Sequence, residues 1–478
     1  MKANKKIISI VLAIVLVLSA SAVAFADWVQ YGDDDDHNAY LTSGAPTSMT
    51  GNSSTAINLT PGLSGYSGVE NTPVMQTING TTYAYVLFNG RGTNGAQVAK
   101  YNANTRTEIW RTTAYGTQNT SLNAQSGFQL STPYLDTKGT DSDNSDDVLY
   151  VGVLSQYDDY VGGEWLTGTG SKILRISNLD ADGTNDMPLV ENIWTNITGQ
   201  INTPIVKYGN YIYFGTWVSN TGAGTYYQID VSGTTVTSNN VKTYSPGSYG
   251  FYWAGAVSDG TRIYFGGDNG KLYWRQAGSK FGTKGGVLDL TDTNLGGIGY
   301  AGNVRSTVVL YNGSLYFTSQ GSAATAAQGG YLWCCNFDTT ESELVISWYA
   351  GLVGGSTSTP TIVNNRIYVG TYGVKGKGIR CVDISTHAVT QLETTLPIQS
   401  QIAVMRSGNL DYLYFTVNDS IATANNPNHY GGGYCYSYNG STLSSVWSIS
   451  CAYALNGMAI DGGKAAFGND GNAFYIVQ

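Results

Sequence analysis

The chain has 478 residues, of which 42% are hydrophobic and only 12% are charged. So large an apolar fraction can bury a core, which excludes wholesale disorder. The 33 acidic residues outnumber 24 basic ones and give a formal net charge of −9. An acidic balance of this kind argues against a nucleic-acid partner.

The first 26 residues have the features of a secretory signal peptide. Three lysines precede an apolar stretch over 7–23, and Ala24 and Ala26 frame a small-x-small cleavage site. No later apolar run reaches the ~18 residues that a spanning helix needs, so we expect no membrane span. The sequence therefore predicts one mature domain over 27–478, secreted and either extracellular or at the cell surface.

A two-strand unit recurs eight times between residues 72 and 468. Each unit has an apolar strand, a polar turn and a second strand rich in aromatic and small residues, as in TPIVKYGNYIYFG from 203 and TPTIVNNRIYVG from 359. A period of about fifty residues with strands throughout is typical of the blades of a β-propeller.

The count of later strands in each unit predicts how the ring closes. All eight units continue with a third strand, but only seven have a fourth, and the chain ends on the third strand AFYIVQ. The segment AINLT at 56–60 is placed to supply the missing strand, which would remove two exposed sheet edges. We therefore expect an all-β, eight-bladed propeller whose last blade is completed by an N-terminal strand.

These repeats resemble the PQQ-like, or quinoprotein-type, β-propeller repeat over essentially the whole mature chain. The opening segment from Trp28 to Tyr40 is similar to the lead-in of that family. The tryptophan expected in the fourth strand is present in four units, at Trp110, Trp194, Trp348 and Trp447. The resemblance implies the fold and leaves the activity open.

One acidic loop has the spacing of a calcium site. Its oxygen-bearing residues alternate around a turn glycine, Gly183, a pattern that can wrap a hard cation. We predict a structural calcium ion bound by Asn178, Asp180, Asp182, the Thr184 carbonyl and Asp186. The alternative is a solvated acidic turn.

A second loop is similar to FG-GAP calcium loops, with Asp141, Asp143 and Asp147 as its ligands and Asn144 where glycine is expected. Propeller topology places both loops in the second blade, on one face. The acidic run at 33–36 lacks ligand spacing, and we expect it to form a solvated turn.

The vicinal pair Cys334 and Cys335 invites comparison with quinone-dependent dehydrogenases, which carry adjacent cysteines beside the quinone. In this chain the pair falls within a third strand, where small buried side chains are expected, as for Cys381 and Cys435. The sequence therefore disfavours PQQ as a cofactor.

Long loops on one predicted face are rich in aromatic residues, and four of these residues are the candidate ligand contacts: Trp165, Trp217, Tyr252 and Trp253. Rigid aromatic side chains suit sugar rings or peptide segments. The alternative is that they fill the core between blades.

These observations favour a secreted, non-catalytic binding or scaffolding propeller for a carbohydrate or protein ligand, so an enzyme is the less favoured class. A quinone-dependent dehydrogenase is one alternative. A cell-surface adhesin or matrix subunit is another, which the low charge content fits.

Overall fold

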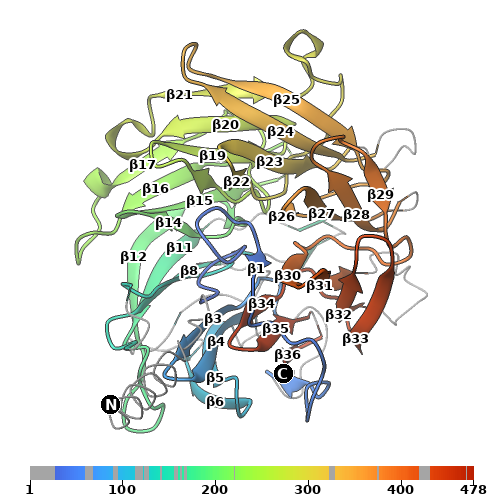
Figure 1. Ribbon diagram of the computed structural model, residues 1–478. Helices are drawn as coiled ribbons and strands as arrows, with labels where there is room; N and C mark the ends of the chain where they lie inside the picture. The colour runs from blue at the N-terminus through green and yellow to red at the C-terminus, as the bar shows by residue number, and fades with distance from the viewer. Residues whose placement is uncertain are drawn as a thin grey trace, which may run out of the picture.

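Eight four-stranded antiparallel blades surround a central channel in the computed structural model of the chain (Figure 1). The structure describes residues 27–59, 68–89, 95–113, 122, 129–139, 143–154, 160–161, 164–165, 170–219, 221–321, 329–373, 376–418, 431–469 and 471–478. The predicted signal peptide lies outside these residues. Within them, no helix is long and apolar enough to cross a membrane.

Each blade is an antiparallel meander that starts at the channel. The strands of blades 1 to 4 are, from inside to outside, β3 (Val74–Ile78), β4 (Thr81–Asn89), β5 (Ala96–Asn102) and β6 (Thr107–Arg111); β7 (Tyr134–Asp136), β8 (Val148–Leu154), β11 (Ser171–Ser177) and β12 (Leu189–Ile197); β14 (Val206–Tyr208), β15 (Tyr211–Trp217), β16 (Tyr226–Asp230) and β17 (Val241–Tyr244); and β18 (Val257–Ser258), β19 (Arg262–Gly267), β20 (Lys271–Gln276) and β21 (Gly285–Asp289).

Blades 5 to 8 follow the same order. Their strands are β22 (Val309–Tyr311), β23 (Ser314–Ser319), β24 (Tyr331–Asp338) and β25 (Glu343–Gly351); β26 (Thr361–Val363), β27 (Arg366–Thr371), β28 (Gly378–Asp383) and β29 (Val389–Gln391); β30 (Ala403–Ser407), β31 (Leu410–Asn418), β32 (Gly431–Tyr438) and β33 (Leu443–Cys451); and β34 (Ala459–Asp461), β35 (Lys464–Gly468), β36 (Ala473–Val477) and the N-terminal β2 (Ile57–Asn58).

Several short elements lie outside the four-stranded pattern of the blades. They are β1 (Tyr40–Leu41), which pairs in parallel with β30; the hairpin of β9 (Tyr160–Val161) and β10 (Glu164–Trp165); and β13 (Gln200–Ile201), which pairs with β15. The described residues also form the 3-10 turns η2 (Ser238–Asn240), η3 (Gly278–Lys280) and η4 (Thr293–Leu295).

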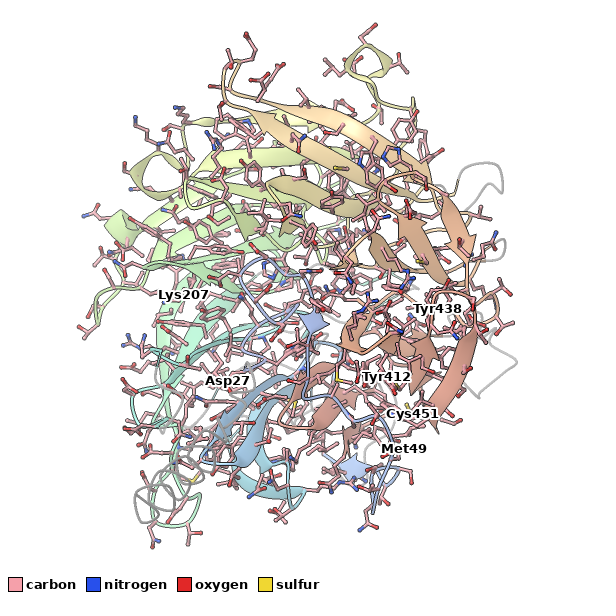
Figure 2. The ribbon with its side chains drawn as sticks, in the orientation of Figure 1. Asp27, Met49, Lys207, Tyr412, Tyr438 and Cys451 are labelled. Atoms are coloured by element: carbon pink, nitrogen blue, oxygen red, sulfur yellow. The ribbon has the colours of Figure 1, made fainter. Side chains whose placement is uncertain are left out.

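Successive side chains of a strand point to opposite faces of its blade. Each strand therefore contributes apolar side chains to the cores on both sides of that blade. In β15, Ile212 and Phe214 pack toward blade 2, whereas Tyr213 packs toward blade 4. Met49, Tyr412 and Cys451 pack at the edge of the core that blade 8 shares with its neighbours (Figure 2). The blades are thus held by apolar layers between them.

Asparagine-glycine turns set the register of the inner hairpins. Asn79 and Gly80 have φ values of 50° and 79°, and Asn312 and Gly313 have 49° and 79°. Two consecutive positive φ angles fit the two-residue hairpin turn, which asparagine and glycine tolerate best.

The predicted ring closure is confirmed. β2 pairs antiparallel with β36, with Ile57 opposite Phe474 and Asn58 opposite Ala473. The Leu59 N–H also donates to the Asn472 carbonyl at 3.0 Å. The fourth strand of blade 8 therefore comes from the beginning of the chain.

The segment before β2 lies across the central channel, and we call residues 28–41 the N-terminal plug (Figure 1). It forms hydrogen bonds to the first segments of six blades: Met75 N to Trp28 O, Leu135 N to Val29 O, the His37 ring to Ala256 O, Leu310 N to Asp36 O, Ile362 N to Asn38 Oδ1, and Val404 N to Ala39 O. Tyr208 of blade 3 donates to the Asp35 carbonyl at 3.0 Å. The plug therefore links most of the ring from inside.

The expectation of a solvated turn at 33–36 is wrong for its first residue. Asp34, Asp35 and Asp36 are exposed, but Asp33 is buried. The plug turns back on itself at this point, with left-handed φ angles at Gly32 and Asp33, and this turn directs the Asp33 side chain inward.

Candidate ligand-binding site

Three of the four predicted aromatic contacts lie together at one end of the channel. Trp217 ends β15, and Tyr252 and Trp253 lie in the connection to blade 4. The Trp217 and Tyr252 rings meet edge to face at 5.5 Å between centroids, and Tyr252 and Trp253 meet at 4.9 Å. The fourth, Trp165, lies in β10, and its side chain is outside the described residues.

The connection that carries these rings is held by a buried neighbour. Phe251 is fully buried, lies edge-on to Tyr226 at 5.0 Å, and donates its N–H to the Thr216 carbonyl. Gly250 permits the close approach, because a Cβ there would lie 3.0 Å from the Thr216 oxygen. Trp253 adopts a left-handed φ of 59°, an unusual conformation for a bulky residue.

Arg305 supports the aromatic group from the side. Its guanidinium carbon lies 4.5 Å from the centre of the Tyr252 ring. Its Nε and Nη2 donate to the two carboxylate oxygens of Asp268 at 2.8 and 2.7 Å. Although burial alone would lower it, the pKa of Arg305 is raised by these hydrogen bonds and by the Asp268 charge. This fork fixes the guanidinium plane.

A recess opens beside this group. Its wall is formed mainly by residues that precede the innermost strands, among them Glu70, Asn71, Asn456 and Arg305, together with Trp253. Tyr31 of the N-terminal plug also lines it. The recess is thus the end of the channel bounded by the plug, and Trp253 joins it to the aromatic group.

Threonines of the repeated Thr-Pro pairs make this wall rigid. The Thr72 hydroxyl accepts from Gly457 N at 3.1 Å, and the Thr132 hydroxyl accepts from Thr72 N at 3.1 Å. Thr359 accepts from Thr307 N in the same way at 3.0 Å. Each bond joins neighbouring blades at the channel, which explains why the repeat carries threonine at this position.

The first predicted calcium loop is an internally hydrogen-bonded turn. Asp182 Oδ1 accepts from the backbone N–H groups of Thr184, Asn185 and Asp186 at 2.8 to 3.2 Å. These and the other hydrogen bonds to its carboxylate lower the pKa of Asp182 to about 2. Asn178 presents its amide nitrogen to Asp186 Oδ1 at 2.8 Å.

Within the described residues, Asp180, Asp182 and Asp186 do not form an acidic group placed to hold a metal. The calcium site stays a prediction.

The second predicted loop is described only in part, because Asp141 lies outside the described residues. Asp143 accepts from Ser145 N at 2.9 Å. Asp147 is buried and accepts from Gln76 Nε2 at 2.7 Å, and burial raises the pKa of Asp147 to about 6.

Lys100 of β5 lies close to both loops, a feature that the sequence patterns did not indicate. Its ammonium donates to the Leu179 carbonyl at 2.6 Å and is attracted by Asp180 and Asp147. Burial nevertheless lowers the pKa of Lys100 to about 8. A protein cation thus already lies near the place where the two loops come together.

The packing role predicted for the vicinal cysteines is confirmed. Cys334 packs in the core toward blade 6, and Cys335 in the core toward blade 4. Cys381 and Cys435 are buried as well. Burial raises the pKa of Cys334, which disfavours the reactive thiolate.

No family model matches the chain, and no curated protein matches it. Among solved structures, it is similar to BamB from Moraxella catarrhalis, with a TM-score of 0.47 and 10% identity over 84% of this chain and 95% of that one. It is also similar to a europium-containing methanol dehydrogenase, with a TM-score of 0.40 and 10% identity over 82% and 90%. The eight-bladed propeller that the repeats predicted is shown by the structure of the chain itself.

Proposed function

We propose that this chain is a non-catalytic binding propeller whose carbohydrate or protein ligand contacts Trp217, Tyr252 and Trp253 at the channel mouth. One observation carries the proposal: these three rings contact one another in series, and the last of them lines the recess. The proposal includes secretion, on the evidence of the signal-peptide features.

The burial of the rings supports a binding role over a purely structural one. All three are half-buried, whereas the neighbouring Phe251 is fully buried and supplies the packing of this connection. Aromatic side chains held in place by neighbours offer large contact areas at low entropic cost. Half-buried rings next to a recess can therefore bind a ligand without a change in the core.

The test is a glycan and peptide array followed by alanine substitution of the rings. Trp253→Ala and Trp217→Ala should each weaken a captured ligand by ~2 kcal/mol or more, with little change in melting temperature. Trp194→Ala is the matched control, because Trp194 is also half-buried but lies on β12, the outermost strand of blade 2.

Two results would contradict the proposal. One is unchanged affinity with a loss of ~3–5 kcal/mol of stability, as expected for rings that only cap the channel. The other is an equal loss of affinity in the Trp194 control, which would show that the effect is not local to the mouth.

A further inference from the structure

We propose that the ligand at the channel mouth is a neutral sugar unit, whose oxygens accept hydrogen bonds from Arg305 and Trp253. This inference rests on the proposed function, because it chooses one of the two ligand classes and names the atoms that recognise it. It is drawn from two accessible N–H donors, from the charge balance around them, and from the backbone of the wall behind them.

The first observation is a guanidinium with an unused donor. The Nε and Nη2 atoms of Arg305 donate to the two carboxylate oxygens of Asp268, whereas Nη1 meets no acceptor among the described residues. The Arg305 side chain is 17% exposed, and Nη1 is not one of the buried atoms that lack a partner. Nη1 is therefore open to solvent. Because Arg305 lines the recess, a ligand at the mouth can reach this donor.

Trp253 supplies a second accessible donor. Its Nε1 finds no acceptor in the described part of the chain and is open to solvent, unlike Trp217 Nε1, which is buried without a partner. Trp253 lines the same recess as Arg305, and the Tyr252 ring contacts both of them. The side chains of arginine and tryptophan can only donate hydrogen bonds. A ligand that uses both groups must therefore bring acceptor atoms.

The charge around these donors favours a neutral ligand over an anionic one. The bidentate pair with Asp268 balances the charge of Arg305. The chain as a whole has a net charge of −9, so its overall field repels a carboxylate or a phosphate. The hydroxyl and ring oxygens of a neutral sugar accept hydrogen bonds without this penalty.

The backbone of the wall favours a sugar over an extended polypeptide. An extended peptide binds by adding to a free strand edge through main-chain hydrogen bonds. The N–H groups of Thr72 and Gly457 in this wall already donate to threonine hydroxyls of neighbouring blades, and Pro204 has no N–H. Arg305 and Trp253 donate from their side chains instead. Such isolated donors beside aromatic rings suit a sugar, whose oxygens accept while its C–H face packs on a ring.

The test titrates the full mature chain with defined probes by isothermal titration calorimetry. Four probes are neutral pentasaccharides built of glucose, mannose, xylose or N-acetylglucosamine. The comparison probes are the acidic pentasaccharide of galacturonate and the neutral peptide Gly-Ser-Gly-Thr-Gly-Ser-Gly. We expect at least one neutral pentasaccharide to bind roughly tenfold or more tightly than both comparison probes, a difference of about 1.4 kcal/mol. This comparison needs no protein variant, so it decides the question even if a variant fails to fold.

Two pairs of variants then test the donors. Arg305→Lys keeps the positive charge but loses the planar fork, so it should weaken the best-bound neutral pentasaccharide about tenfold. Arg175→Lys is the matched control, because the Arg175 side chain is also 17% exposed and paired with a carboxylate, that of Glu191, but lies on β11. It should leave binding unchanged.

Trp253→Phe keeps an aromatic ring and removes only the Nε1 donor, so it should weaken the same pentasaccharide about threefold. Trp194→Phe, on the outermost strand of blade 2, is its control and should have no effect. Failure of all four neutral probes to bind at millimolar concentration overturns the inference. Equal binding of the galacturonate probe, or an equal effect of each variant and its control, overturns it as well.

The ligand class and the proposed function fail separately in this experiment. If a peptide or an acidic glycan binds in a manner that depends on Trp253 while the neutral pentasaccharides do not, the neutral sugar is wrong and the binding site stands. If none of the array ligands or probes binds in a manner that depends on Trp253, both are wrong.

Discussion

Asp461 shows how a single buried carboxylate can make this fold sensitive to pH. It is 1% exposed, and its Oδ2 accepts from the Thr77 hydroxyl at 2.6 Å. Burial raises the pKa of Asp461 to about 6. Burial, and then the charges of Asp34 and Asp461, raise the pKa of Asp33 in the plug. When both are ionised, the plug and blade 8 therefore repel each other.

The pH dependence follows from this shift. The pKa of Asp461 in the folded state lies above its ordinary value of 3.8, so the folded protein binds more protons and its stability falls as pH rises through about 6. Asp461→Asn should remove this loss and raise the free energy of unfolding at pH 7 by on the order of 2 kcal/mol. Urea titrations at pH 5 and pH 7 measure it. Glu341→Gln is the exposed control, and an equal slope in the two variants would contradict the role of Asp461.

Substitution of Asp182 tests two effects separately: the loss of the hydrogen bonds that hold the turn, and the loss of a predicted calcium ligand. Asp182→Ala leaves three backbone N–H groups without their acceptor, which should lower the melting temperature slightly with or without metal. If calcium also binds, the native protein should melt at a higher temperature in calcium than in chelator, and the variant should not. Superimposed melts of the native protein in calcium and in chelator would rule the ion out at this loop.

At the scale of elements, β2 is a very short strand, and we expect its attachment to blade 8 to depend on the adjacent Leu59. Leu59 is fully buried in the core that blade 8 shares with blade 1. Leu59→Ala should therefore cost ~2–5 kcal/mol. The matched control is Leu295→Ala, because Leu295 is 53% exposed and should cost less than ~0.5 kcal/mol. Chemical denaturation of both variants measures the difference, and an equal, small cost would show that this segment does not hold blade 8 closed.

The elements themselves were largely predictable, because each strand carries its own signal. Alternation, turn residues and a repeat of about fifty residues are local properties, and counting third and fourth strands was enough to predict that residues near Ile57 complete blade 8. The fourth strands that Trp110, Trp348 and Trp447 marked in the sequence are β6, β25 and β33 in the structure.

The plug and the recess were not predictable in the same way, because their contacts join distant positions once per molecule. Asn38 pairs with Ile362, 324 residues away, and no repeat signals that contact. Asn71 and Asn456 line one recess only because blades 1 and 8 are neighbours in the ring. The spacing of Asn178 and Asp182 indicated a ligand pattern, but spacing alone could not show that Asp182 caps its own turn.

At the scale of the whole molecule, we expect the plug to make the ring one cooperative unit. Its backbone and side chains bond to blades on all sides of the channel, while β2 seals the last blade. Rings of repeats are otherwise held mainly by contacts between neighbours. A segment that bonds to many blades at once should make unfolding of any one of them costly for all.

Deletion of residues 27–60 tests this coupling. The shortened chain should expose the edge of β36 and lose the plug, so we expect aggregation through the open edge and a broader denaturant transition, because cooperativity between blades is lost. A synthetic peptide of residues 27–60 added in trans should restore the sharp transition. The same peptide with Asn38→Ala should restore it less well, because that asparagine both donates to and accepts from Ile362. Size-exclusion chromatography and urea denaturation measure the two effects. A shortened chain that stays monomeric with an unchanged transition would show that the eight blades hold together without the plug, and the coupling would then lie in the apolar layers between them.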